Sequence, residues 1–221
     1  DERLTTPKVM DAFDALESYF LENGIDQVKY KAIPTIYHHI PAQADQYALF
    51  KKDADMYRRD VTSAVAIQDR PKYKDSRARS IDTATDADVK IQETTDFETY
   101  WDILKQNLSE EHDTSPVHEL EEIQRLHNRF PKNIRLFGAY VDNSLVSGVV
   151  VYESERVART QYIAGNNQAR DVRATDYLFD RLINNHLSDK GYIDFGISTE
   201  QEGEYLNEGL AYYKETFGAR P

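Results

Sequence analysis

The chain has 221 residues, and its 27 Lys and Arg against 39 Asp and Glu leave a formal net charge of −12 at pH 7. That length allows one large domain or two small ones, and a hydrophobic fraction of 40% with 15 Tyr argues against intrinsic disorder. Such an acidic chain argues against binding to nucleic acid or to an anionic membrane, because both require clustered Lys and Arg. The absence of Cys excludes disulfides, thiolate zinc sites and thiol nucleophiles. No apolar run reaches the roughly 18 residues of a membrane span, so we expect a soluble, cytoplasmic protein.

The first 70 residues predict helices and strands in alternation. Thr6 and Pro7 combine a helix N-cap with a proline at the first helical position, and apolar residues recur at helical spacing until Gly24. In chain order, the expected elements are a helix over 6–24, a strand over 25–33, a helix over 44–57 and a β-branched strand over 60–67.

Residues 71–88 are polar and charged, and they predict an exposed linker helix or a domain boundary. The rest of the chain predicts an α+β domain, in which an antiparallel meander of strands precedes a strand–helix–strand–helix tail. Its expected strands cover 89–93, 134–141, 145–152, 157–164 and 192–197, and its expected helices cover 95–108, 115–130, 174–187 and 203–217.

The two ends of the chain carry the same order of elements. Gly24 aligns with Gly191, and helix, strand and helix follow one another in both places. The economical interpretation is two tandem copies of one α/β domain, of which the first lacks its N-terminal half and the second lacks its last strand. We therefore expect part of a first domain at 1–70, a linker helix at 71–88 and a second domain at 89–221.

Four stretches of the sequence resemble a known family: residues 30–38 (YKAIPTIYH), 160–164 (TQYIA), 194–199 (DFGIST) and 205–210 (YLNEGL). Together with the meander and its tail, they resemble the GNAT acyltransferase fold, and tandem copies resemble its bacterial FemAB-like branch, the peptidoglycan cross-bridge peptidyltransferases. The resemblance covers most of the chain. It implies transfer of an acyl or aminoacyl group to an amine by tandem GNAT-like domains, the first of them truncated.

The same resemblance implies acetyl-CoA or another acyl-CoA as co-substrate. In the superfamily, pyrophosphate lies on backbone N–H groups at the start of the helix after the fourth strand, at the pattern R-x-x-G-x-G/A. Arg170 fits the first position, whereas Arg173 and Thr175 stand where the small residues belong, on either side of Ala174. A side chain at the glycine position hinders close approach of the backbone to a ligand. These four residues are the candidate contacts of CoA, and retention or loss of CoA binding stays open.

Three residues are candidates for the chemistry of acyl transfer. Asp194 alternates with apolar neighbours on an expected central strand, where a carboxylate is costly unless paired, so it is either functional or part of a hydrogen-bonded structure. Tyr162 either lines a substrate cleft or packs as a half-buried tyrosine. Lys214 lies two turns from Asn207 on one face of the last helix, as a cleft-lining pair does, or is a solvated cation at the helix end.

Five residues are candidate substrate contacts. Ser198 follows a strand at its C-terminal end, where α/β sheets bind their ligands, and it serves equally well as a helix cap. The other four stand in the stretches that carry the resemblance: Lys31, Tyr37, Gln161 and Asn207.

The histidines indicate no metal site. The side chains of His38 and His39 point to opposite sides in extended structure, and the sequence has no second histidine cluster, so we expect no metal. His118 follows Pro116 at an expected helix start, and we interpret it as a surface or capping residue.

Two classes of function remain open. The first is an enzyme that acylates an amine on a sugar, a cell-wall precursor or a small metabolite; the net charge of −12 leaves no basic stripe for a tRNA and favours a CoA thioester. The second is a catalytically inert binding or assembly module that kept the fold. The open sheet edges expected of two incomplete domains also predict either a fragment of a longer polypeptide or a homodimer.

Overall fold

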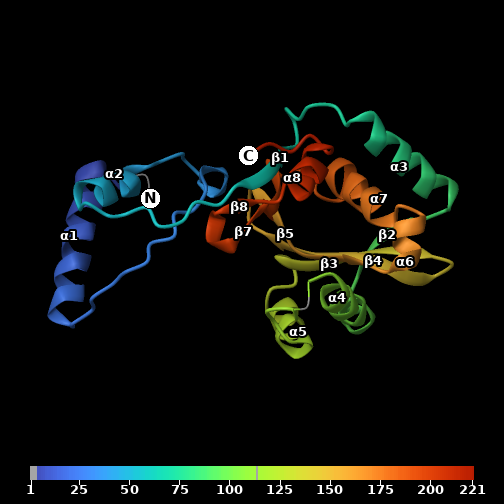
Figure 1. The fold of residues 1–221 in the computed structure, drawn as a ribbon, viewed down its shortest axis with the longest axis horizontal. Coiled ribbons are helices and arrows are strands. Elements are labelled where there is room, and N and C mark those ends of the chain that lie inside the picture. Colours follow the sequence, from blue (N-terminus) through green and yellow to red (C-terminus); the bar gives the residue numbers. More distant parts are fainter. Residues whose placement is uncertain (1–3, 113) are drawn as a thin grey trace. The chain divides into compact units, whose positions relative to one another are not determined.

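The computed structural model describes residues 4–112 and 114–221, which form two compact units that divide between Arg58 and Arg59 (Figure 1). The smaller unit ends at Arg58, and the larger unit holds the rest of the chain. Within the described residues, no helix has the length and apolar character needed to cross a membrane.

The smaller unit contains two helices, α1 (Thr6–Glu22) and α2 (Ala44–Lys51), with a 3-10 turn at Thr35–Tyr37. Residues 23–34 are all described and contain no strand, so the strand expected over 25–33 is wrong. A strand needs a hydrogen-bonded neighbour, and the described part of this unit supplies none. The repeat of helix, strand and helix is therefore broken in its first copy, and a tandem duplication is not shown.

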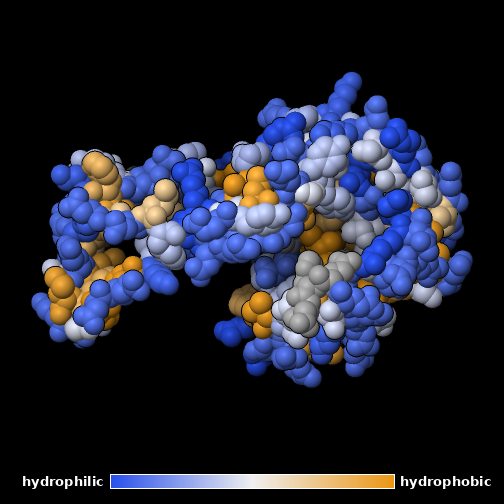
Figure 2. Space-filling model, in the orientation of Figure 1, coloured by the Kyte–Doolittle hydropathy of each residue, from blue (hydrophilic) through white to orange (hydrophobic). Residues whose placement is uncertain are grey.

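The smaller unit buries little of its apolar surface. Among its described residues, Ala48 is the one that is buried. Lys52 joins α2 to α1 through ion pairs of 2.6 Å with Asp14 and with Glu17, and Figure 2 shows hydrophobic side chains exposed around α1. The large apolar side chains exposed in this unit are those of Leu4, Leu16, Tyr19, Leu21, Ile25, Val28, Tyr30, Ile33, Ile40, Tyr47, Phe50, Met56 and Tyr57. Such a surface is typical of a segment that binds a partner.

The larger unit is built on one six-stranded mixed sheet in the order β1-β6-β5-β4-β3-β2. Every neighbouring pair is antiparallel except β5 and β6, which are parallel. The antiparallel meander and the parallel crossover confirm an α+β fold. The strands are β1 (Thr62–Ala66), β2 (Lys90–Thr94), β3 (Ile134–Val141), β4 (Ser144–Glu153), β5 (Val157–Gly165) and β6 (Tyr192–Ile197).

Helices cover both faces of this sheet (Figure 1). On one face, α4 (Phe97–His112) and α5 (Leu120–Arg129) enclose a core around Trp101 and Leu136. The opposite face carries the other core, around Phe179 and Phe217. The elements of that face are α3 (Asp75–Asp86), α6 (Asn167–Asp171), α7 (Ala174–Arg181) with a π-helical turn at Leu182–His186, and α8 (Glu208–Glu215). A small hairpin of β7 (Thr199–Glu200) and β8 (Tyr205–Leu206) precedes α8, which therefore starts later than residue 203.

The first strand of the chain completes the sheet of the larger unit. β1 pairs with β6 from Ala66–Tyr192 to Thr62–Ile197, and its other edge exchanges backbone hydrogen bonds of 2.8 and 2.9 Å between Ala64 and Arg220. We expected β1 in a separate sheet and β6 at an open edge, and both expectations are wrong. The physical reason is that the unpaired N–H and C=O groups of an edge strand form hydrogen bonds with another segment of the chain, whether that segment is near or distant in sequence.

The polar segment before β2 is helical as expected, but it is not fully exposed. α3 packs on α7 and buries Arg77 and Ala84. The Arg77 guanidinium bonds to the Asp176 carboxylate and to Thr216 Oγ1, and it stacks on the ring of Phe217 at 4.1 Å. One buried and paired arginine therefore anchors a helix whose composition resembles a linker.

Candidate active site

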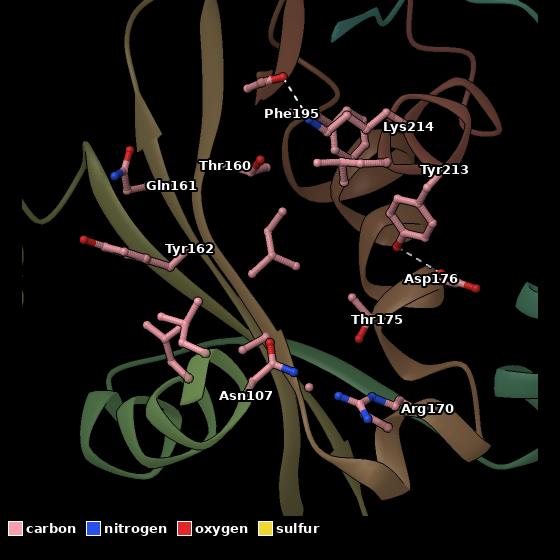
Figure 3. A pocket seen from close by; sticks show the side chains of 18 of the residues that line it. Asn107, Thr160, Gln161, Tyr162, Arg170, Thr175, Asp176, Phe195, Tyr213 and Lys214 are labelled. Carbon is pink, nitrogen blue, oxygen red and sulfur yellow. Dashed lines mark hydrogen bonds between the residues drawn. The ribbon is translucent and has the colours of Figure 1, made fainter. Parts of the chain in front are cut away.

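Two adjacent parallel strands separate and open a cavity. β5 and β6 pair at only three positions, from Val157–Tyr192 to Arg159–Asp194, and then continue without pairing to Gly165 and Ile197. The gap is a cavity of about 630 Å³, closed by α4 on one side and by α7 and α8 on the other (Figure 3). Polar and charged side chains line it: Asn107, Arg159, Thr160, Gln161, Tyr162, Arg170, Arg173, Thr175, Asp176, Tyr213 and Lys214.

Each of the two separating strands has a bulge beside the cavity. The register of β5 against β4 passes from Tyr162 to Thr160 and skips Gln161. The register of β6 against β1 also shifts, at Gly196, whose φ of +76° is a conformation that glycine adopts at least cost. Bulges of this kind leave backbone groups outside the ladder, where side chains or a ligand can bind them.

Asp194 lies at the last β5–β6 pair, and its residue is 0% exposed. Its carboxylate accepts hydrogen bonds of 2.8 Å from Thr62 Oγ1 and from the Gly196 amide, and it pairs with Arg159 at 3.2 Å. These contacts join β1, β5 and the β6 bulge at the point where the strands separate. Of the two roles left open by the sequence, the geometry realises a hydrogen-bonded structure, and Asp194 is not among the residues that line the cavity.

Lys214 reaches the cavity from α8, and its residue is 2% exposed. Its Nζ donates to the carbonyl oxygens of Gly196 at 3.0 Å and Ile197 at 2.6 Å, and to Ser198 Oγ at 3.0 Å. Burial lowers the pKa of the Lys214 ammonium to about 8, an effect that Asp194 opposes and Arg159 reinforces. The result is a desolvated cation held by the end of β6.

The opposite end of the cavity lies at the start of α7, where Figure 3 shows Arg170 far from Lys214. Arg173 is the N-cap residue of α7 and has a left-handed backbone with φ of 58°, a conformation that glycine adopts at least cost. Thr175 Oγ1 lies 2.8 Å from Ser147 Oγ, so its hydroxyl is engaged with β4. Ala174 is buried. The first N–H groups of α7 lack intrahelical acceptors, and such a helix start suits an anion.

Tyr162 forms the wall of the cavity next to the β5 bulge. Its ring packs edge to face on Trp101, and its hydroxyl lies 2.5 Å from His118 Nδ1 and 3.3 Å from the His118 amide nitrogen. We expected His118 to be a surface or capping residue, and its contact with Tyr162 was not predicted because 44 positions separate the two residues.

The remaining predicted residues lie in different places. Ser198 is buried, and its Oγ accepts a hydrogen bond from Lys214 Nζ. Asn207 caps α8 by accepting from the Leu210 amide at 2.9 Å, and it donates to Glu200 at 2.7 Å. Lys31 and Tyr37 belong to the smaller unit. Among the described residues, no group of three His, Cys, Asp or Glu is arranged to hold a metal ion.

A mixed sheet whose one parallel pair opens around a cavity, with a helix start at one end of it, is the fold of a GNAT-type acyltransferase. Residues 70–215 match the family model of the acetyltransferase (GNAT) domain, and the chain therefore belongs to this family. No curated protein matches the sequence.

Solved structures of low sequence identity share the fold. FemX superposes with a TM-score of 0.70 at 10% identity, over 96% of this chain and 74% of that chain. The C-terminal domain of a putative lysylphosphatidylglycerol synthetase from Agrobacterium fabrum gives 0.60 at 11%, over 79% of this chain and 61% of that one. L-PGS from Bacillus licheniformis superposes with a TM-score of 0.58 at 9% identity, over 78% of this chain and 60% of that chain. The chain thus spans about three fifths of the two latter proteins.

Proposed function

We propose that the protein is an N-acyltransferase that moves an acyl group from a thioester donor of the acyl-CoA type to an amine on a sugar, a cell-wall precursor or a small metabolite. The observation that carries this proposal is the cavity between β5 and β6, which has a helix start with two arginines at one end and a buried cation at the other. Membership of the GNAT family supports an acyl donor, and the fold shared with FemX is consistent with an aminoacyl group as the alternative.

The residues at the start of α7 fit the diphosphate of such a donor. Arg170 and Arg173 are exposed at the cavity rim, and the free N–H groups of the first turn lie beside them. The nearest carboxylate in that turn, Asp176, is neutralised by its contacts with Arg77 and Tyr213. Arg173 has a left-handed backbone, the conformation that glycine adopts at least cost, although its own side chain is larger.

The reaction needs no reactant beyond the two substrates. The amine nitrogen attacks the thioester carbonyl carbon, the C–N bond forms, and the C–S bond breaks as the thiolate leaves. One amine proton ends on the sulfur, so that the products are an amide and a free thiol. The protein contributes by orienting the two groups and by stabilising the oxyanion of the tetrahedral intermediate.

Lys214 supplies positive charge for that oxyanion. With a pKa of about 8 it is mostly protonated at pH 7, and its three N–H bonds go to the cavity wall, so it acts by its charge and not as the base. The bulge at Gln161 faces it across the cavity and adds a main-chain donor outside the ladder. Asp194 positions the wall through Gly196.

Calorimetry with acetyl-CoA tests the donor, and thiol release from acetyl-CoA with glucosamine or a lysine-containing peptide tests the transfer. Lys214→Ala should lower turnover by about 10²–10³-fold, the effect of losing one stabilising group for an oxyanion. Lys132→Ala, at an exposed site outside the cavity, should match the wild type. A wild-type protein that neither binds acetyl-CoA nor releases thiol would refute the proposal.

An inert binding module is the second candidate, and the arginine at the glycine position of the phosphate loop favours it. It predicts that acetyl-CoA neither binds to the protein nor releases its thiol in the presence of an amine. The proposal also keeps two untested expectations: a cytoplasmic location, where acyl-CoA is found, and a homodimer that covers the apolar surface of the smaller unit.

A further inference from the structure

A second hollow adjoins the cavity, between α3 and the start of α7. Its volume is about 460 Å³. Arg173, Asp176 and Tyr213 line both spaces, so the two adjoin at the start of α7. The other side chains that line it come from α3: Ser76, Arg77, Arg79, Ser80 and Thr83.

The floor of this hollow is fixed and electrically neutral. Arg77 is buried, bonded to Asp176 and Thr216, and stacked on Tyr213 at 4.7 Å. Tyr213 Oη in turn donates to Asp176 Oδ1 at 3.0 Å. The one carboxylate that lines the hollow is therefore already paired, and it leaves no uncompensated negative charge to repel an anion.

The rim of the hollow carries two further arginines. Arg79 and Arg173 are both exposed, and neither forms an ion pair with any described residue. In a chain of net charge −12, two unpaired guanidinium groups over a neutral floor form a local positive site. A guanidinium binds phosphate through two parallel hydrogen bonds, and a pair of them favours a phosphate ester over a carboxylate of single charge.

We propose that this hollow binds a phosphate ester of the donor, separate from the diphosphate at the start of α7. This inference rests on the proposed function. In coenzyme A the ester is the phosphate on the ribose, and in a tRNA it is a backbone phosphate. The described geometry favours coenzyme A, because the site is one hollow and not a long basic groove.

Coenzyme A and dephospho-coenzyme A differ by that one phosphate, and calorimetry compares their affinities. The wild type should bind coenzyme A about tenfold more tightly, as expected for a charge-assisted contact. Arg79→Ala should abolish this preference and leave the affinity for dephospho-coenzyme A unchanged. Arg129→Ala, an exposed arginine on α5 at the other face of the sheet, should keep the preference.

The outcomes separate this inference from the proposed function. Equal affinities of the wild type for the two compounds, or equal weakening of both by Arg79→Ala, would overturn the phosphate site while the transferase proposal stands. Absence of binding to either compound would overturn the transferase proposal with a CoA donor. If an RNA hairpin of acceptor-stem length bound instead and Arg79→Ala weakened it, the phosphate site would be supported with a tRNA as its source.

Discussion

The two edges of β6 behave in opposite ways. Toward β1, pairing runs the length of the strand, from Tyr192 to Ile197, with one bulge. Toward β5, pairing stops after Asp194, and the cavity begins there. The six residues of β6 are thus paired along the whole strand on the β1 side and form one wall of the cavity on the β5 side.

This difference has a local cause. Past Asp194, β6 turns at Gly196, where the amide is used by the Asp194 carboxylate and the carbonyl by Lys214. Side chains thus satisfy backbone groups that a β5 partner would otherwise bind. The paired side of β6 also stabilises the side that faces the cavity, because Thr62 of β1 donates a hydrogen bond to Asp194. The cavity therefore depends on a strand that lies outside the family match at 70–215.

Among the variants of β6 and its neighbours, Asp194→Asn should cause the largest loss of stability. The variant loses the negative charge and one acceptor oxygen among Thr62, Gly196 and Arg159, so the free energy of unfolding should fall by about 1–3 kcal/mol. Urea denaturation measures it, with the exposed Asp82→Asn as the control. Acetyl-CoA affinity should fall as well, because the β6 bulge loses its anchor. An unfolding free energy equal to that of the control would show that Asp194 does not hold the two edges together.

The pH dependence of stability tests the buried cation at the open edge. Burial lowers the pKa of Lys214 from 10.5 to about 8 in the folded protein. Between these values the unfolded chain keeps a proton that the folded chain has lost, so this group makes stability rise with pH from about 8 to about 10.5. Below about pH 8 both states are protonated and the contribution is constant.

Lys214→Met removes that titration and serves as the reference. The difference in unfolding free energy between wild type and variant, followed by urea denaturation from pH 7 to 10.5, should change in favour of the wild type across this window. Because other groups titrate equally in both proteins, the difference isolates Lys214. A constant difference would mean that the ammonium is not desolvated.

Local patterns in the sequence predicted most elements of the larger unit. The strand at 192–197 has the expected bounds, and the strand at 134–141 as well, because apolar side chains and turn residues delimit them. Pairing between distant segments was not predictable in this way. β1 and β6 lie far apart in the sequence, and nothing in either segment specifies the other, whereas the segment 25–33 has strand composition but no partner.

The site was predictable where it depends on position within one element. Ser198 was expected just after the strand at 192–197 and Lys214 on the last helix, and the hydrogen bond between them was not predicted. The bulges at Gln161 and Gly196 arise from register between strands, which a single sequence does not display. The contact between His118 and Tyr162 was not predictable either, because it depends on how the fold places the His118 loop.

The smallest expected effect concerns how the β5 wall is held. Beyond Arg159, β5 has no β6 neighbour, and besides its ladder with β4 it is contacted by α4 and by the loop before α5. His118 supplies two of these contacts, since its ring nitrogen and its amide both approach the Tyr162 hydroxyl. His118→Ala removes the ring contact and keeps the amide contact. It should therefore lower the unfolding free energy by about 0.5–1.5 kcal/mol, the net value of one hydrogen bond.

A double variant tests whether the two residues act together. If the hydrogen bond between His118 and Tyr162 supports the β5 wall, Tyr162→Phe should add little to the loss of stability caused by His118→Ala. Both single variants should weaken acetyl-CoA binding slightly. Fully additive losses would show that the two residues stabilise the wall independently, and unchanged stability in both variants would show that β5 is held by its β4 neighbour alone.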